Sequence, residues 1–311
     1  MPETLVVTAP ATSANLGPGF DCLAVALDLS NAVVITKRPG PLEVIVTGEG
    51  ADEIATDASN LVCRALASGI GDLDGLHVEC RNRIPMGRGL GSSASAVCAG
   101  LVAANALGGL RWSPAEIIRR AAELEGHADN AAACLEGGLV AVTPRDTITR
   151  IPTPAGLTFV AAIPEARVST DQARRALPES VPMADAVRTV ISAISLILAL
   201  RDGPLDAITG MLDDALHEPY RGALIPGFET MRGLTGQHGC LGVTISGSGP
   251  SVLLWCRTED ADGVAAAASA ALGEAGHPDV RMRISNVAPA GVRARWTGGG
   301  ADDTHLERSI G

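Results

Sequence analysis

The chain has 311 residues, of which 46% are apolar, so it can bury a full hydrophobic core, and its length suits one large domain or two lobes. Its formal net charge of -11 argues against a protein that binds nucleic acid through a basic face, because phosphate neutralisation needs clustered Lys and Arg. Seven cysteines without a C-x-x-C pair, and an N-terminus without a basic and apolar signal region, argue against export, so we expect a cytoplasmic protein.

The first half of the chain predicts strands followed by helices. Segments rich in β-branched residues and bounded by Gly or Pro are typical of strands. Runs of good helix formers closed by glycine are typical of helices, and the run after Ser113 also has Pro114 and Glu116 in a capping-box arrangement. In chain order we expect strands at 5–9, 32–37, 42–48 and 76–81, helices near 59–69, 93–107 and 113–126, and a further apolar segment at 137–144.

The second half mixes helices and strands. Its most apolar stretch, residues 189–200, is shorter than the roughly 20 residues that a membrane span needs, so we expect no membrane insertion. The expected elements are a strand at 157–164, helices near 183–201, 204–216 and 227–237, a strand pair within 241–255 and a helix at about 260–273.

Repeated prolines after residue 143 mark the expected boundary between two lobes. We place an N-terminal lobe at 1–152 and a C-terminal lobe at 153–296. The residues at 297–311 are rich in glycine and polar side chains, so we expect a disordered tail there.

A loop rich in glycine and serine, PMGRGLGSSASA at 85–96, lies between an expected strand and an expected helix. A helix N-terminus offers unpaired N–H groups and a partial positive charge, and glycine lets the backbone approach a phosphate closely. The loop lacks the Gly-Lys-Ser/Thr of a Walker A motif, and Gly87, Gly89 and Gly91 do not fit the G-x-G-x-x-G pattern. On these residues alone the loop is either a phosphate cradle or a tight turn with serine caps.

The pattern P-x-x-x-G-L-G-S-S-A, which begins at Pro85, resembles the ATP-binding signature of the GHMP kinases. Two further segments match this superfamily in the same order, at 9–29 and 242–253. The resemblance implies ATP as phosphate donor and a GSGP turn that approaches the phosphates, the alternative being an ordinary hairpin. We expect Asn60 and Val62 in the adenine pocket wall, the alternative being a helix start. The other implied ATP-binding residues are Pro85, Gly87, Arg88, Gly89, Leu90, Gly91, Ser92, Ser93, Ala94, Ser95, Gly247, Ser248 and Gly249.

Within the superfamily, the segments at 11–21, 125–130, 169–178 and 216–228 resemble the homoserine kinases more than their relatives. This resemblance implies phosphate transfer from ATP to L-homoserine, a small zwitterion that needs an anion for its ammonium and cations for its carboxylate. Arginine suits the carboxylate because its planar guanidinium binds bidentately. The implied acceptor-binding residues are Asn15, Asp21, His127, Arg174 and Arg221.

Each of these five residues has a structural alternative. Asn15 and Asp21 can form an Asx-turn in a Gly-Pro loop. Arg174 and Arg221 can be solvated surface side chains, and His127 can be a structural residue near a helix end. The sequence alone leaves both interpretations open.

The resemblance also implies Mg²⁺ held by few protein oxygens, since phosphoryl transfer from ATP needs the ion on the phosphates. Ser93 and Glu125 match the family's metal pair, with Glu123 as the alternative carboxylate on the same helix. Thr170 resembles a hydroxyl near the transferred phosphate, and its alternative is a helix N-cap.

The expected catalytic residues are Asp21, Asn130 and Thr170. Asn130 stands where several superfamily relatives place an aspartate as general base, and we expect the neighbouring Asp129 to face away. A loose phosphoryl-transfer transition state develops little charge on the nucleophile, so positioning and phosphate neutralisation can supply most of the rate enhancement. We therefore expect no side chain to act as a full base, and Asp21 to orient the acceptor through its ammonium group.

The implied architecture is α+β: the two-lobed GHMP kinase fold, with an N-terminal lobe like domain 2 of ribosomal protein S5, a C-terminal ferredoxin-like lobe and the nucleotide between them. The chain departs from the family at Thr189 and Ser192, where Asn and often Arg are expected, and this departure puts acceptor specificity in question. Three alternatives remain: a GHMP kinase for another small alcohol such as mevalonate, a non-catalytic nucleotide-binding relative, and a structural protein. Family habit suggests a homodimer, and we expect no nucleic-acid or membrane partner.

Overall fold

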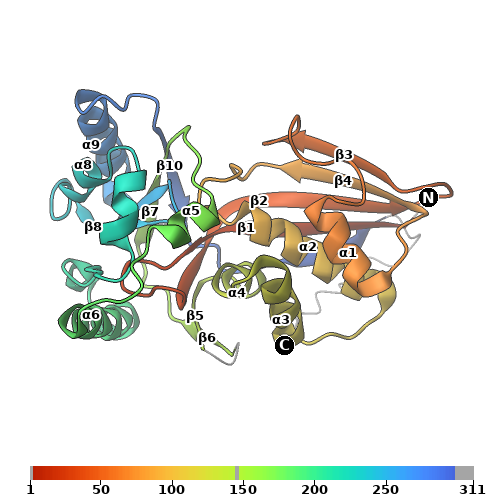
Figure 1. Ribbon diagram of the computed structural model, residues 1–311, viewed down its shortest axis with the longest axis horizontal. Helices are drawn as coiled ribbons and strands as arrows, with labels where there is room; N and C mark the ends of the chain where they lie inside the picture. Colours follow the sequence, from red (N-terminus) through yellow and green to blue (C-terminus); the bar gives the residue numbers. More distant parts are fainter. Residues whose placement is uncertain (1–2, 144–146, 298–311) are drawn as a thin grey trace.

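A computed structural model describes residues 3–143 and 147–297 and shows an α+β protein built on two sheets (Figure 1). The four-stranded sheet lies at one end of the molecule with α6, α8 and α9, and the long strands of the other sheet extend to the opposite end beside α1, α2 and α3. The tail expected at 297–311 lies outside the described residues apart from Thr297, which ends a strand.

The larger sheet has seven strands in the order β11-β1-β2-β4-β3, with β5 pairing with β2 and β6 pairing with β5. The β3–β4 pair is parallel and the others are antiparallel. Four helices pack on one face over a core that contains Leu5, Val7 and Ala9, alternate residues of β1, as the two-residue period of a strand requires. The bounds are β1 Thr4–Ala14, β2 Leu23–Lys37, β3 Glu43–Gly48, β4 Leu76–Asn82, β5 Leu139–Val142, β6 Ile148–Ile151, β11 Arg293–Thr297, α1 Leu61–Ile70, α2 Ser92–Gly108, α3 Pro114–Glu125 and α4 Asp129–Glu136.

The smaller sheet is antiparallel in the order β10-β7-β9-β8. Its core with α8 and α9 contains Val160, Leu254 and Val264. The bounds are β7 Leu157–Ile163, β8 Cys240–Ile245, β9 Val252–Arg257, β10 Arg281–Asn286, α5 Thr170–Arg175, α6 Met183–Asp202, α7 Glu218–Arg221, α8 Phe228–Arg232 and α9 Ala261–Glu274, with single 3-10 turns η1 Leu205–Ile208, η2 Gly222–Leu224 and η3 Thr258–Asp260.

One hydrophobic core joins the two sheets. Phe159 of β7 and Trp255 of β9 meet edge to face, with ring centroids 5.0 Å apart. They share a buried cluster with Leu23 of β2 and with Leu90 of the glycine loop. The glycine loop is therefore anchored where the two halves of the molecule meet.

The chain deviates from the expected elements in both halves. In the first half, β1 and β2 are longer than the strands expected at 5–9 and 32–37. The helix expected at 204–216 is wrong, since only η1 forms there and Gly210, at a φ of 84°, follows it. The helix expected at 227–237 ends at Arg232, before Gly233 and Gly236. The short elements α4, β6, α7, β10 and β11 were not expected, and α5 was expected only as the alternative interpretation of Thr170.

The limits of the two lobes stay a prediction. The structure adds that β11 returns to the first sheet, where it pairs with β1 rather than with β10. By length and composition alone, α6 is apolar enough to cross a membrane, being 20 residues long and thus longer than the apolar stretch expected from the sequence. Its Leu196 and Leu200 pack in the core that joins the two sheets, so α6 forms part of the globular C-terminal half.

Candidate active site

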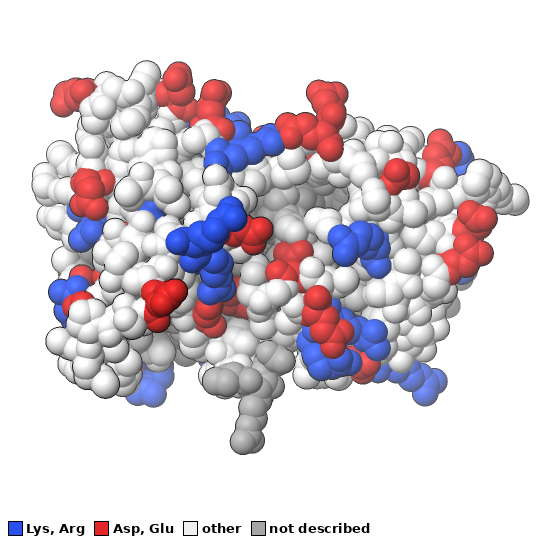
Figure 2. All heavy atoms as spheres, in the orientation of Figure 1, with Lys and Arg blue, Asp and Glu red and all other residues white. Residues whose placement is uncertain are grey.

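A cavity of about 360 Å³ lies between the two halves of the molecule, within the size range of small-molecule sites. Figure 2 shows it as a hollow with basic and acidic side chains at its rim. The cavity brings together most of the predicted residues. Those that line it are Asn15, Asp21, Asn60, Val62, Gly87, Arg88, Gly89, Leu90, Gly91, Ser92, Ser93, Ala94, Glu125, His127, Asn130, Thr170, Arg174, Arg221, Gly247 and Ser248.

The glycine loop approaches two other segments so closely that side chains are excluded. Gly87, Gly89 and Gly91 have φ values of 68°, 70° and 67°, the left-handed region that favours glycine. A Cβ at Gly89 would overlap the carbonyl oxygen of Ser246, and one at Gly91 would overlap the hydroxyl of Thr12. Gly91 is the N-cap of α2, and among the described residues no side chain caps this helix, so its first N–H groups are available to an anion.

The turn between β8 and β9 packs against this loop, as the resemblance implied. The N–H of Gly247 donates to the carbonyl of Ala14 at 3.0 Å, and the hydroxyl of Ser246 donates to the carbonyl of Gly89 at 2.6 Å. Gly249 does not line the cavity, because its N–H turns inward to the carbonyl of Ser246 at 2.8 Å. The turn therefore reaches the cavity through its first two residues.

Two other residues expected to bind ATP also lie outside the cavity lining. Pro85 is buried, and Ser95 is buried with its hydroxyl donating to the carbonyl of Ala9 at 3.1 Å. The Ser95 side chain therefore joins α2 to β1 and does not face the cavity.

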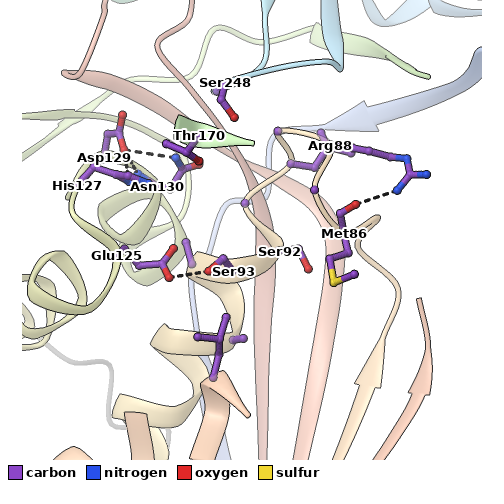
Figure 3. A pocket seen from close by; sticks show the side chains of 18 of the residues that line it. Met86, Arg88, Ser92, Ser93, Glu125, His127, Asp129, Asn130, Thr170 and Ser248 are labelled. Carbon is purple, nitrogen blue, oxygen red and sulfur yellow. Dashed lines mark hydrogen bonds and ion pairs between the residues drawn. The ribbon is translucent and has the colours of Figure 1, made fainter. Parts of the chain in front are cut away.

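Arg88 lines the cavity, but its guanidinium is occupied by backbone groups. It donates to the carbonyls of Met86, Pro164 and Glu165 at 2.8 to 3.0 Å. The bonds to Pro164 and Glu165 attach the glycine loop to the segment that follows β7, a strand of the other sheet. Figure 3 shows the bond between Arg88 and Met86.

The two residues expected to hold the metal face each other across the cavity floor. The hydroxyl of Ser93, in the first turn of α2, donates to Glu125 Oε1 at 2.6 Å (Figure 3). The alternative carboxylate, Glu123, pairs instead with Arg119 at 2.5 Å and is exposed. Hydroxyl and carboxylate oxygens are donors that suit a hard cation such as Mg²⁺.

At the acceptor end, two arginines have different partners. The guanidinium of Arg174 forms a bidentate pair with the carboxylate of Asp21, at 2.7 and 2.8 Å. Arg221 is only 2% exposed, donates to the carbonyls of Ala173 and Gly247, and has no carboxylate partner among the described residues. Burial and the nearby guanidinium of Arg174 lower the pKa of Arg221. A buried cation without a counterion at the edge of a cavity is a binding position for an anion.

Asn15 shapes the loop that carries Asp21. Its Oδ1 accepts from the N–H of Asp21 at 3.1 Å, and its Nδ2 donates to the carbonyl of Gly247 at 2.6 Å. Asn15 and Asp21 have φ values of 73° and 54°, which non-glycine residues seldom adopt. Asn15 therefore has a structural role in its loop, and it also lines the cavity.

The segment around α4 places three polar side chains beside the glycine loop (Figure 3). His127 Nδ1 lies 3.2 Å from Asp129 Oδ1, and this interaction, the largest of several, raises the pKa of His127. The hydroxyl of Thr12 donates to Asn130 Oδ1 at 2.7 Å. The expectation that Asp129 faces away is wrong, because it lines the cavity and is 5% exposed.

Thr170 is the first residue of α5 and lines the cavity. The N-cap of this helix is Ser169, which forms a complete capping box with Gln172. The alternative role for Thr170 as the cap is therefore wrong, and Thr170 keeps its place in the cavity lining.

The wall of the cavity beside α1 is largely apolar. Asn60 caps α1 by accepting from the N–H of Val62 at 2.9 Å, so the structural alternative for Asn60 is correct while both residues still line the cavity. Sequence reasoning missed most of this wall, whose members are scattered and carry no shared motif. The lining residues that were missed in the cavity as a whole are Asn31, Ile54, Cys80, Asn82, Met86, Ala96, Leu124, Asp129 and Val168.

The two departures from the family pattern do not line the cavity. Thr189 and Ser192 are buried on α6, and the hydroxyl of Thr189 accepts from the N–H of Ala215 at 3.0 Å. Their side chains therefore serve packing around α6, and the doubt about acceptor specificity that they raised does not apply to the cavity lining.

Comparison with known proteins gives a consistent result. The chain matches the GHMP kinases N terminal domain over residues 54–138 and the GHMP kinases C terminal domain over residues 196–274. It is 40% identical to a homoserine kinase of Synechococcus sp. (strain WH7803) over 277 residues, covering 85% of this chain and 88% of the relative. It is 42% identical to a homoserine kinase of Moorella thermoacetica over 260 residues, covering 81% and 87%. The crystal structure of homoserine kinase from Cytophaga hutchinsonii superposes with a TM-score of 0.84 at 30% identity, covering 94% of this chain and 97% of that one.

Proposed function

Because the chain belongs to the homoserine kinases of the GHMP kinase superfamily, we propose that its cavity binds ATP along the glycine loop and L-homoserine beside Arg221. The reaction is the ATP-dependent phosphorylation of L-homoserine to O-phospho-L-homoserine, a step of threonine biosynthesis. The observation that carries the assignment of the site is a single cavity lined by both the uncapped start of α2 and the buried, unpaired Arg221.

The phosphates of ATP are assigned to the N-terminus of α2. The left-handed glycines bring the backbone N–H groups to the ligand, and the helix dipole favours its negative charge. The apolar wall beside α1 suits the adenine ring, since Val62 and its neighbours offer apolar surface at that end of the cavity.

Ser93 and Glu125 are assigned to Mg²⁺. The hydroxyl of Ser93 and the carboxylate of Glu125 would hold the ion, which suits Mg²⁺ because this ion is usually bound by one or two protein oxygens at phosphate sites. When bound, the ion neutralises charge on the phosphate oxygens. The protein's part is to bring the hydroxyl of Ser93, at the start of α2, within 2.6 Å of Oε1 of Glu125, at the end of α3.

The acceptor site is assigned to Asp21, Arg174 and Arg221. In the structure Asp21 and Arg174 neutralise each other, and their side chains are 44% and 40% exposed, so separating them costs only about 1 kcal/mol or less. A zwitterion can replace both partners at once, its ammonium binding Asp21 and its carboxylate binding the arginines. An acceptor with a carboxylate and no ammonium, such as mevalonate, leaves Asp21 without a partner.

Asn130 and Thr170 act by position rather than by taking the proton. Asn130 Oδ1 already accepts from the hydroxyl of Thr12, and an amide is too weak a base to be protonated at neutral pH. Alignment of the acceptor hydroxyl and neutralisation of the phosphates then supply the rate enhancement, because the loose transition state places little charge on the nucleophile.

The test is ADP release from ATP and Mg²⁺ in the presence of L-homoserine, mevalonate, L-serine or no acceptor. We expect release that depends on L-homoserine, with wild type active and Arg221→Leu weakened by about 100-fold in kcat/KM, the loss typical of a charged hydrogen-bonded partner. Arg38→Leu removes an exposed arginine that does not line the cavity and is the control for the loss of one positive charge.

Release driven by mevalonate, or by no acceptor, would contradict the assigned substrate site. Equal losses in Arg221→Leu and Arg38→Leu would contradict the role of Arg221.

The expected homodimer stays a proposal, and α6 is the surface that favours it. Among the exposed large apolar side chains, six lie on this helix: Met183, Val187, Val190, Ile191, Ile194 and Leu198. Its four charged residues are two Asp and two Arg, so two copies can approach without net repulsion although the whole chain carries -11. A second copy of the chain therefore fits this face.

The described cysteines are all free. Free cysteines agree with the proposed cytoplasmic location, where thiols are kept reduced.

A further inference from the structure

One aromatic ring lies at the acceptor end and has no role so far. Phe20 precedes Asp21, and its ring stacks on the ring of His217, with centroids 5.0 Å apart and planes inclined by 22°. The guanidinium carbons of Arg174 and Arg221 lie over the same ring, at 5.3 and 5.1 Å from its centroid. The ring is thus within cation–π distance of both arginines assigned to the acceptor carboxylate.

The electrostatic problem at this point is the proximity of two positive charges. Arg174 has Asp21 as a partner, whereas Arg221 is buried and, within residues 3–143 and 147–297, donates to backbone carbonyls alone. The negative face of an aromatic ring attracts cations, and more strongly where water is excluded. The Phe20 ring therefore compensates part of the repulsion between the guanidinium groups before any substrate is present.

His217 holds the ring in place from the protein interior. Its side chain is fully buried, and Nε2 donates to the carbonyl of Gly17 at 2.8 Å. Burial, the largest cause, lowers the pKa of His217, although the carboxylate of Asp214, whose Oδ2 lies 3.6 Å from Nε2, acts in the opposite direction.

We propose that Phe20 is a positioning residue for L-homoserine: the face of its ring holds the guanidinium groups of Arg174 and Arg221 together, in the arrangement that receives the acceptor carboxylate. This inference rests on the proposed function, which assigns the two arginines to that carboxylate.

The test compares ring electronics with side-chain shape. Phe20→Leu keeps an apolar side chain without a ring, and 4-fluoro-, 3,5-difluoro- and 3,4,5-trifluorophenylalanine at position 20 keep the shape while depleting the negative ring face. We expect the KM for L-homoserine to rise stepwise with fluorination, to about tenfold, and to rise at least as much in Phe20→Leu, while kcat and the KM for ATP change less than about twofold. In an Arg221→Leu background the effect of Phe20→Leu is smaller, because one of the two cations is gone.

Three outcomes would overturn the inference: fluorinated variants with the wild-type KM for L-homoserine, a parallel rise in the KM for ATP, or an unchanged effect in the Arg221→Leu background. The fluorinated series keeps the test decisive if Phe20→Leu does not fold. If Arg221→Leu alone leaves the KM for L-homoserine unchanged, it is the carboxylate assignment of the proposed function that has failed. If Arg221→Leu raises this KM and the Phe20 variants do not, only the inference about Phe20 has failed.

Discussion

At the scale of single residues, the glycine loop requires glycine for two different reasons: a left-handed backbone and a close contact that leaves no room for a Cβ. Gly87 and Gly89 share a left-handed backbone, but only at Gly89 would a Cβ overlap a backbone oxygen, that of Ser246. At Gly87 the nearest atom is 3.4 Å away, in the flexible side chain of Arg167. Alanine would therefore strain the backbone at both positions, but it would cause a steric overlap only at Gly89.

We expect Gly89→Ala to lower kcat/KM for ATP by about 100-fold or more, because the loop must move away from the β8–β9 turn. Gly87→Ala should lower it by no more than about 30-fold, since only the left-handed strain of roughly 1–2 kcal/mol applies. Steady-state kinetics with ATP varied, together with melting temperatures, measure both effects. Equal losses in the two variants would show that the overlap with Ser246 does not matter.

Glu218 is a buried carboxyl behind the acceptor site. It is 4% exposed, its Oε1 accepts from the N–H of Ile245 at 2.7 Å, and burial, as the main cause, raises its pKa from 4.5 to about 8. Because the folded state binds this proton more tightly than the unfolded chain, stability is fully present below about pH 4.5 and is lost as pH rises through 8.

Glu218→Gln keeps the acceptor for Ile245 and removes the titration. We therefore expect the free energy of unfolding of wild type to fall, relative to that of the variant, between about pH 5 and pH 8. Urea denaturation at several pH values measures this difference, and the exposed Glu229→Gln is the control. Parallel pH profiles for wild type and Glu218→Gln would rule out the titration of Glu218 in this range.

The sequence predicted which residues gather at the site better than how they pair. Asp21 and Arg174 were expected as separate ligands of the acceptor, yet they bind each other across 153 positions of sequence separation. Nothing local in either segment reports such a contact, because it depends on where the loop after β1 and helix α5 come together. Asp129 was misjudged for the same reason, since its direction depends on α4, which the sequence did not reveal.

At the scale of elements, α5 shows how a short helix can present functional groups. It has six residues, too few for a helix to be stable alone, and it carries both Thr170 and Arg174 into the cavity. The Ser169 and Gln172 capping box satisfies the N–H groups at its start. The order of this segment therefore depends strongly on its cap.

We expect Ser169→Ala to cost about 1 kcal/mol of local stability and to raise the KM for L-homoserine about threefold to tenfold, with a smaller change in the KM for ATP. Ser113→Ala removes the N-cap of α3 and is the matched control for a lost cap away from the acceptor. Kinetics with the two substrates varied separately distinguish the variants. If both caps affect the KM for L-homoserine equally, α5 has no special link to the acceptor.

Elements with strong local signals were predicted well, and elements fixed by tertiary contacts were not. Helix α3 begins at Pro114, directly after its N-cap Ser113, and ends before Gly126, as its cap, proline and glycine indicate. The helix expected after residue 204 does not form, because the carboxylate of Asp214 accepts from the N–H groups of Leu216, His217 and Glu218 and holds that segment in another path. Composition alone does not distinguish these cases.

At the scale of the whole molecule, the apolar face of α6 predicts a dimer. We expect wild type to sediment as two copies, and the double variant Ile191→Glu with Ile194→Glu to sediment as one, because four buried carboxylates cannot be paired at the interface. Both side chains are more than half exposed in the single chain, so folding and phosphorylation activity per chain should persist. Ile284→Glu, on β10, is the control. A monomeric wild type would contradict the dimer.

The two-lobed architecture was predicted correctly, through resemblance to a known family rather than through periodicity. The return of the chain to its first sheet was not predicted. Arg293–Thr297 pairs with Thr4–Thr8, so the last described strand closes beside the first. A strand of five residues after a proline- and glycine-rich segment has no sequence signal for its distant partner.

The core that joins the two sheets limits how this protein can be recombined. Leu23, Leu90, Phe159 and Trp255 come from segments up to 232 positions apart and fill one continuous volume. Since close-packed interiors tolerate little change in shape, a chimera that takes one half from a relative will inherit mismatched side chains beneath the glycine loop. A functional chimera of this enzyme therefore requires that the core residues of the two halves be exchanged together.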